Sequence, residues 1–202
     1  MIEFKKYDWK NLAAAKDATE IPKAIKDLAK AKSTVEAEKI RAKFEYNLFY
    51  NEDVYEAAVP AINCILSFIN DASAHGRAEA FSMLYDLGAG YADFEEHQYI
   101  DSAEAALQKR CRKAVENGIS QYFYFFENGS DLDRLNLTDL LELCSREDGE
   151  IRNRAIWFIQ HFERNCENLK LSKVYHRNLR ELSLHHQTRR NPQCDSSRSE
   201  AE

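Results

Sequence analysis

The chain has 202 residues, 44% of them hydrophobic and 31% charged, and its formal net charge is −6. A chain of this length can bury a substantial core without disulfides, and its five cysteines include no Cys-x-x-Cys pair that would indicate a zinc ribbon or a thioredoxin-like site. The N-terminus lacks the apolar run of a signal peptide, and the longest mostly apolar run, residues 57–69, is too short to span a bilayer. We therefore expect a soluble, cytoplasmic protein with reduced cysteines and no membrane partner.

Helices are predicted in the first half of the chain by apolar residues that recur at helical spacing. The predicted ranges are 21–31, 34–49, 54–69, 73–87 and 100–116. Pro22 falls in the first turn of the first helix, where a proline is well tolerated. Pro60 lies inside the third range, so we expect either a kink there or a helix that begins at that residue.

Residues 119–127 are the most ambiguous segment. The run Tyr122-Phe123-Tyr124-Phe125-Phe126 has strand propensity, but its short length and its helical neighbours favour a buried helix. Further helices are predicted over 133–145, 150–164 and 171–182.

The C-terminal segment differs in composition from the rest of the chain. Residues 186–202 are polar and poor in apolar side chains, which predicts a disordered tail. The remainder, 1–185, is interpreted as a single domain.

Charge is distributed unevenly along the chain. Residues 44–108 contain twelve acidic residues and one basic residue, Arg77, and so carry −11, whereas residues 1–43 carry +4, 109–169 carry −2 and 170–202 carry +3. Two interpretations stay open: the blocks are the two faces of a repeat protein, or the acidic segment attracts a basic partner.

The predicted helices recur as hairpins, which is typical of an α-solenoid. The pairs are 21–31 with 34–49, 54–70 with 73–88, 100–117 with 119–127, and 133–145 with 150–164. In the last pair, the segment from Arg146 to Ala155 resembles the acidic turn and second helix of a HEAT repeat. Nearer the N-terminus, the sequences Tyr7-Asp8-Trp9, Ile21-Pro22 and Val54-Tyr55-Glu56-Ala57 resemble the opening of a group of bacterial HEAT-repeat-like proteins.

This resemblance implies an all-α fold, a right-handed α-solenoid of about four HEAT-like hairpins with a C-terminal capping helix over 171–182. Proteins of this kind occur among immunity proteins that neutralise bacterial toxins, so the resemblance also implies a protein-binding role. The chain departs from the group in two places: Tyr50-Asn51-Glu52 replace the His-Gln-Gly turn of its relatives, and the second helix lacks the Val-Arg-x-x-Ala spacing.

Motifs for nucleotide or acyl chemistry are absent from the sequence. There is no Gly-x-Gly-x-x-Gly, no Gly-Lys-Ser or Gly-Lys-Thr, and no Gly-x-Ser-x-Gly. His161-Phe162-Glu163 has the His-x-Glu form of a zinc deaminase, but the accompanying Pro-Cys-x-x-Cys is missing.

Two other histidine groups were considered as sites. Glu181 with His185 and His186 could ligate a metal from one helix face, but a helix-end ion pair explains them more simply. His97 beside Glu95-Glu96 could act as an acid–base group, but an acidic surface loop explains it more simply. We therefore predict a protein that is not an enzyme and has no metal or cofactor.

Tyrosines beside carboxylates make the acidic segment a candidate partner-binding surface. The candidate residues are Tyr46, Tyr50, Glu52, Asp53, Tyr55, Glu56, Tyr85, Asp86, Tyr91, Asp93, Glu95 and Glu96. The alternative, that the tyrosines pack in the core, stays open.

Three functions follow as competing hypotheses. The first is an immunity protein that binds and neutralises a basic bacterial toxin. The second is a HEAT-like nucleic-acid-binding or DNA-repair protein, which is disfavoured because phosphate binding needs a basic groove and the basic residues concentrate at the two ends of the chain. The third is a HEAT-like lyase or assembly factor, for which no local residue argues.

Overall fold

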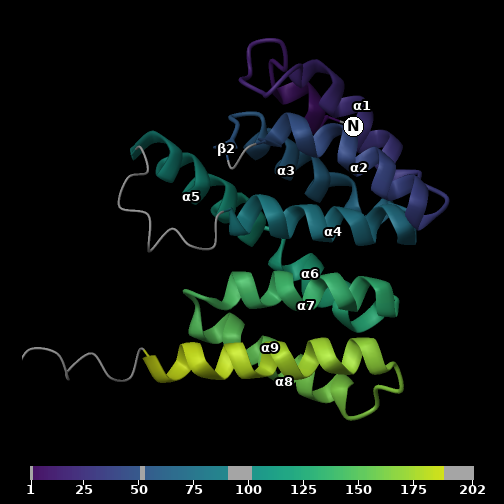
Figure 1. The fold of residues 1–202 in the computed structure, drawn as a ribbon, viewed down its shortest axis with the longest axis vertical. Helices are drawn as coiled ribbons and strands as arrows, with labels where there is room; N and C mark the ends of the chain where they lie inside the picture. The colour runs from purple at the N-terminus through teal and green to yellow at the C-terminus, as the bar shows by residue number, and fades with distance from the viewer. Residues whose placement is uncertain (1, 51–52, 91–101, 189–202) are drawn as a thin grey trace, which may run out of the picture.

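The computed structural model describes residues 2–50, 53–90 and 102–188, and for 50, 53, 102 and 185–188 it describes the backbone alone (Figure 1). Within these residues the fold is all-helical apart from one short strand pair, which confirms the expected all-α class. The helices are α1 (Ile21–Ala29), α2 (Thr34–Leu48), α3 (Ala58–Phe68), α4 (Ala74–Ala89), α5 (Ser102–Glu116), α6 (Ile119–Asn128), α7 (Asp131–Ser145), α8 (Gly149–Glu163) and α9 (Leu169–Thr188). Short 3₁₀ turns cover Glu3–Lys6, Ala18–Glu20 and Ile69–Asp71. None of the described helices is both long and apolar enough to cross a membrane.

The third helix begins later than the sequence predicts. Val54 belongs to strand β2 (Asp53–Val54), which pairs antiparallel with β1 (Phe49–Tyr50), and α3 starts at Ala58. Pro60 consequently lies in the first turn of α3, where its missing amide hydrogen removes no helical hydrogen bond. The predicted start at 54 is wrong, and the helix begins two residues before Pro60, the start that the alternative had given.

The aromatic segment 119–127 is helical, as α6. Four of its rings are buried: Tyr122, Phe123, Phe125 and Phe126. They pack on more than one side, since Phe123 meets Phe158 of α8 at 5.1 Å and Tyr122 meets Phe81 of α4 at 6.1 Å between ring centroids. A short helix that is buried on several faces has no clean apolar stripe, which explains the ambiguity of this segment.

The helices are stacked along the long axis of the molecule, with α1–α3 at one end and α8 and α9 at the other (Figure 1). Within the stack α2, α4, α7 and α9 pack side by side in that order. Neighbouring helices in this row run parallel, because their contacts join early residues to early residues and late residues to late ones. Arg77 near the start of α4 pairs with Asp133 near the start of α7, and Asp139 in the middle of α7 accepts a hydrogen bond from Asn178 in the middle of α9.

The pairing of the later helices differs from the prediction. We expected 100–117 to pair with 119–127, but α5 packs against α3 and α4, whereas α6 packs against α7. The two helices direct their apolar faces differently: Val115 of α5 packs towards Gly88 of α4, while Phe123 and Phe126 of α6 pack on Phe158 of α8. The predicted capping helix, α9, packs against both α7 and α8.

The segment 146–155, which resembles a HEAT repeat in sequence, stabilises both the end of α7 and the start of α8. Asp148 caps α8 by accepting hydrogen bonds from the amides of Glu150 and Ile151. Arg152, only 5% exposed, donates to the carbonyls of Ser145 and Arg146 at 2.9 and 2.7 Å and so satisfies the end of α7. The described apolar core forms one continuous cluster, from Phe4 to Leu182.

Candidate functional site

Seven of the twelve predicted partner-binding side chains lie outside the described part of the structure. They are Tyr50, Glu52, Asp53, Tyr91, Asp93, Glu95 and Glu96. Of the predicted disordered tail, 186–202, residues 186–188 belong to helix α9 (Leu169–Thr188), and the rest lies outside the described residues.

The other five predicted residues do not share one position. Tyr46 lies on α2 with Lys16 Nζ 4.5 Å from its ring centroid, Tyr55 is half-buried after β2, and Glu56 is exposed. Tyr85 and Asp86 lie on α4, between α2 and α7, where they join charged residues that the sequence analysis had not singled out.

The guanidinium of Arg41, on α2, contacts three carboxylates. It donates to Glu45 at 3.0 Å, to Glu79 at 3.3 Å and to Asp86, and also to the Ser82 hydroxyl at 2.7 Å. The side chains in this group are between 13% and 34% exposed. One cation cannot neutralise three anions, so the group carries two uncompensated negative charges when all three are ionised.

Burial raises the pKa of Asp86 from 3.8 to about 6, and this effect outweighs Arg41, which lowers the pKa. The neighbouring Glu45 and Glu79 raise it further. Asp86 thus gains a proton in weakly acidic solution.

We expect Asp86→Asn to flatten the pH dependence of stability below neutrality. The folded-state pKa is raised, so between pH 3.8 and about 6 the folded protein binds a proton that the unfolded chain releases. The free energy of unfolding should therefore increase as the pH falls through this window and decrease as the pH rises through it. Urea unfolding at several pH values should show this slope in the wild type and a reduced slope in Asp86→Asn, while the exposed Asp27→Asn on α1 should keep it. An unchanged slope in Asp86→Asn would show that Asp86 is not the group that titrates.

The negative charge continues from α4 to α7. Tyr85 is half-buried. Burial is the main cause that raises the pKa of its hydroxyl, and the negative charge of the nearby Glu142 is the second. Glu142, 9% exposed, accepts a hydrogen bond from Arg146 at 3.1 Å. Beside it, Asp139 accepts hydrogen bonds from Arg177 and Asn178 of α9.

Glu45, Asp86 and Glu142 occupy equivalent positions, each three residues before the last residue of its helix. We call these three residues the acidic edge. A carboxylate is unfavourable in the last turn of a helix, because the carbonyl end of the helix is itself negative. The helix end alone would favour lysine or arginine there, and ion pairs with Arg41 and Arg146 offset part of this cost on three adjacent parallel helices.

Arg77, the one basic residue of the segment 44–108, does not neutralise the acidic edge. It lies near the opposite end of α4, 14% exposed, and pairs with the fully buried Asp133 at 2.8 Å. Its guanidinium also lies over the ring of Phe125 at 4.4 Å. Arg77 therefore stabilises the contact between α4 and α7 and does not pair with the acidic edge. The three carboxylates of the edge pair with Arg41 and Arg146, so they keep one uncompensated negative charge when all three are ionised.

Sequence reasoning missed Arg41, Glu79 and Glu142 because it looked for tyrosines next to carboxylates. The sequence held a coarse signal: the predicted helices 34–49, 73–87 and 133–145 each carry an acidic residue within four residues of the predicted C-terminal end. The partners Arg41 and Asp86 are 45 residues apart and cannot be joined from the sequence.

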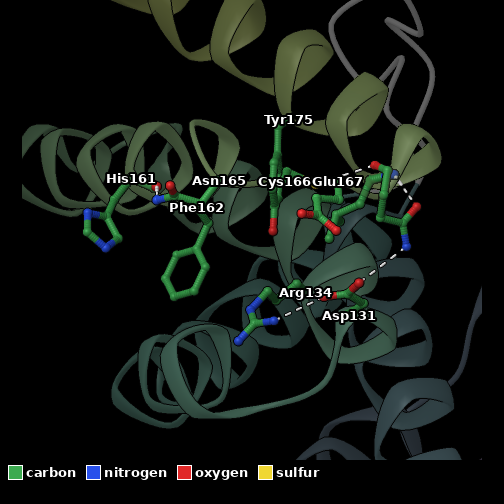
Figure 2. A pocket seen from close by; sticks show the side chains of 10 residues that line it. Asp131, Arg134, His161, Phe162, Asn165, Cys166, Glu167 and Tyr175 are labelled. Carbon is green, nitrogen blue, oxygen red and sulfur yellow. Dashed lines mark hydrogen bonds and ion pairs between the residues drawn. The ribbon is translucent and has the colours of Figure 1, made fainter.

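A cavity of about 330 Å³ lies at the other end of α7 (Figure 2). It is lined by Asp131, Arg134, His161, Phe162, Asn165, Cys166, Glu167, Asn168, Leu171 and Tyr175. Figure 2 shows Tyr175 reaching from α9 towards Arg134, with Phe162 on one side and Cys166 and Glu167 on the other. The acidic edge and this cavity are distinct features at opposite ends of α7.

The zinc-deaminase interpretation gains no support from the geometry. His161 is exposed and stacks on Trp157 at 5.5 Å, whereas Glu163 pairs with His176 at 3.0 Å. Among the described residues no group of three or more histidine, cysteine, aspartate or glutamate side chains is placed to hold a metal ion. Glu181 is exposed on α9, while His97 and the side chains of His185 and His186 lie outside the description.

Comparison with known proteins identifies no relative: no protein-family model, no curated protein and no solved structure matches the chain. The resemblance to HEAT-repeat proteins therefore stays a prediction.

Proposed function

We propose that this chain is a protein-binding α-solenoid, and specifically an immunity protein that binds and neutralises a basic bacterial toxin. The observation that carries the proposal is the acidic edge, in which Glu45, Asp86 and Glu142 repeat at one position along three adjacent parallel helices. No catalytic group is assigned, and nucleic acid is disfavoured as a partner because this edge would repel phosphate.

The solenoid assignment is supported by the arrangement of the helices. α2, α4, α7 and α9 form one row, and α1, α3, α6 and α8 each pack against a member of that row. Adjacent parallel helices related by a repeating step are the arrangement that stacked helical repeats produce. A solenoid presents the same turn of successive helices along one side, which is how a charge placed once per repeat becomes a continuous edge.

A basic partner is supported by the electrostatics. Glu45 and Asp86 are about one-third exposed, at 30% and 34%, so their carboxylates are accessible to a partner, whereas the more buried Glu142 adds to the potential. A cationic side chain approaching Asp86 would hold its carboxylate ionised and return its pKa towards the ordinary value. Long-range attraction of this kind speeds association and is weakened by salt.

The toxin assignment rests on the likeness of the N-terminal segments to the bacterial HEAT-repeat-like group. It commits the proposal to a definite partner, a basic toxin domain encoded beside the gene for this chain. It also predicts that co-expression of the two proteins relieves growth inhibition by that domain.

Neutralising the acidic edge should weaken partner binding. We expect the triple variant Glu45→Gln, Asp86→Asn, Glu142→Gln to associate with the toxin domain at least about tenfold more slowly at low salt, because the attraction that steers the encounter is lost. Association rates measured by surface plasmon resonance at about 0.05 M and about 0.5 M salt should converge for wild type and variant as screening increases.

The matched control removes the same charge elsewhere. Glu104→Gln, Glu127→Gln and Glu150→Gln are exposed positions on α5, α6 and α8, and this triple variant should bind as the wild type does. Equal slowing by both triple variants would show that only net charge matters and would reject the acidic edge as the binding surface. Toxicity that co-expression fails to relieve, despite binding, would reject the immunity role.

A further inference from the structure

The cavity at the start of α7 contains a buried hydroxyl without a partner. Tyr175 is 1% exposed, and its hydroxyl oxygen has no hydrogen-bond partner among the described residues. Burial raises the pKa of this phenol well above its usual value, so the group stays a neutral O–H that can donate and accept. Leaving such a group unpaired is unfavourable, and buried polar groups are almost always paired.

A second buried tyrosine shows that this fold does satisfy such hydroxyls elsewhere. Tyr122 is fully buried, and its hydroxyl donates to the Val115 carbonyl at 2.7 Å. The hydroxyl that lacks a partner is the one whose side chain lines the cavity (Figure 2). The missing partner is therefore to be sought in the cavity.

Arg134 and Cys166, which also line the cavity, already make hydrogen bonds within the protein. Arg134 donates from Nε, Nη1 and Nη2 to the carbonyl of Phe126, the carboxylate of Asp131 and the carbonyl of Glu127, and its planar group lies over Phe162 at 4.6 Å. The Cys166 thiol donates to the Asn168 carbonyl at 3.3 Å. Glu167 and His161 also line the cavity but are exposed, so Tyr175 offers the buried polar contact among the described lining residues.

The charged side chains around the cavity disfavour an anionic ligand. Asp131 and Glu167 outnumber Arg134, and the two helix starts beside the cavity are already capped. Ser130 caps α7, and the Asn168 side chain accepts from the amides of Lys170 and Leu171 at the start of α9. A phosphate or carboxylate would find no free helix amides and a net negative wall.

We propose that this cavity binds an uncharged aromatic small molecule with a carbonyl or amide group, whose oxygen accepts a hydrogen bond from Tyr175 and whose ring lies against Phe162 and Leu171. Its volume, about 330 Å³, falls at the small end of ligand-binding cavities. The site is independent of the proposed partner surface. Asp131 and Glu142 lie near opposite ends of α7, roughly 16 Å apart along the helix axis, so either assignment can fail without the other.

Benzamide and benzoate make a matched pair of probes, because they share a ring and differ in charge. Titrating ¹⁵N-labelled protein with benzamide should give saturable chemical-shift changes in the amides of Asn165, Asn168 and Leu171. Benzoate should bind at least about tenfold more weakly. No saturable change with benzamide, or equal affinity for benzoate, overturns the proposal.

The hydroxyl is tested by Tyr175→Phe, which keeps the buried ring. Affinity for benzamide should fall about fivefold, the effect of one hydrogen bond, while the urea midpoint should not fall, because no bond of the free protein is removed. Tyr124→Phe removes an exposed hydroxyl from α6 and should leave the affinity unchanged. Equal affinity for benzamide in Tyr175→Phe and wild type overturns the assignment of the hydroxyl.

Discussion

Replacing Asp133 with alanine should lower the free energy of unfolding by about 4 kcal/mol, because it leaves the charge of Arg77 buried without its partner. Asp133 is fully buried and accepts hydrogen bonds from Arg77 Nε and Nη2 at 2.9 and 2.8 Å. It also accepts from the amide and hydroxyl of Ser130, each at 2.8 Å, which completes the capping box of α7. The Asp133 side chain thus links α4 to α7 and caps the N-terminus of α7.

Asp148→Ala is the matched control for this effect. Asp148 also caps a helix, but it is exposed and makes no ion pair in the described structure, so its loss should lower stability by only about 1 kcal/mol. Urea unfolding followed by circular dichroism measures both variants. Equal losses would mean that the contact with Arg77 contributes nothing beyond the cap.

Gly76→Ala should lower the free energy of unfolding by about 3 kcal/mol, because there is no room for a β-carbon at this position. An added Cβ would lie 1.9 Å from the backbone carbonyl oxygen of Leu28. The same contact between α1 and α4 is held by Ser73, which donates from its amide to the Ala29 carbonyl at 2.8 Å and from its hydroxyl to the Ala31 carbonyl at 2.6 Å. To admit a methyl group, the end of α1 must move away and strain these bonds.

Gly149→Ala is the opposite case and the control. Gly149 begins α8, and an added Cβ would meet no atom within 4 Å. Alanine should therefore raise stability by roughly 0.5 kcal/mol through its better helix propensity. Thermal unfolding of the two variants should shift the midpoint in opposite directions; a loss of similar size in both would show that backbone propensity, not the contact with α1, decides the effect at Gly76.

Helices whose apolar residues lie on one clear stripe were predicted from the sequence. For α1 the apolar residues Ile21, Ile25 and Leu28 of the predicted range 21–31 lie on one face and are all buried. Such predictions succeed because burial of one helical face is a local property of the pattern. The third helix was predicted to start too early because Val54-Tyr55-Glu56-Ala57 has a helical composition, while its backbone pairs instead with Leu48 and Ala13.

The candidate site was predicted only in part. Of the twelve residues chosen from composition, Tyr85 and Asp86 belong with the charged residues between α2, α4 and α7, and Tyr46, Tyr55 and Glu56 lie elsewhere. Composition identifies an acidic segment, but it does not predict which carboxylates form an ion pair with a basic side chain. Arg41, the residue that organises this group, belongs to the basic N-terminal block of the chain.

The helical class, most helix positions and the uneven distribution of charge could be predicted from the sequence, because periodicity, caps and charge counts are properties of neighbouring residues. The pairing of the helices, the position of Arg77 and the set of carboxylates that share Arg41 could be read from the fold alone. These features depend on contacts between residues tens of positions apart. The apolar stripe of a helix shows which face is buried, but it does not identify the helix that packs against that face. The same holds for Tyr175: its sequence neighbourhood describes a core tyrosine, and the cavity it lines exists only where α7, α8 and α9 meet.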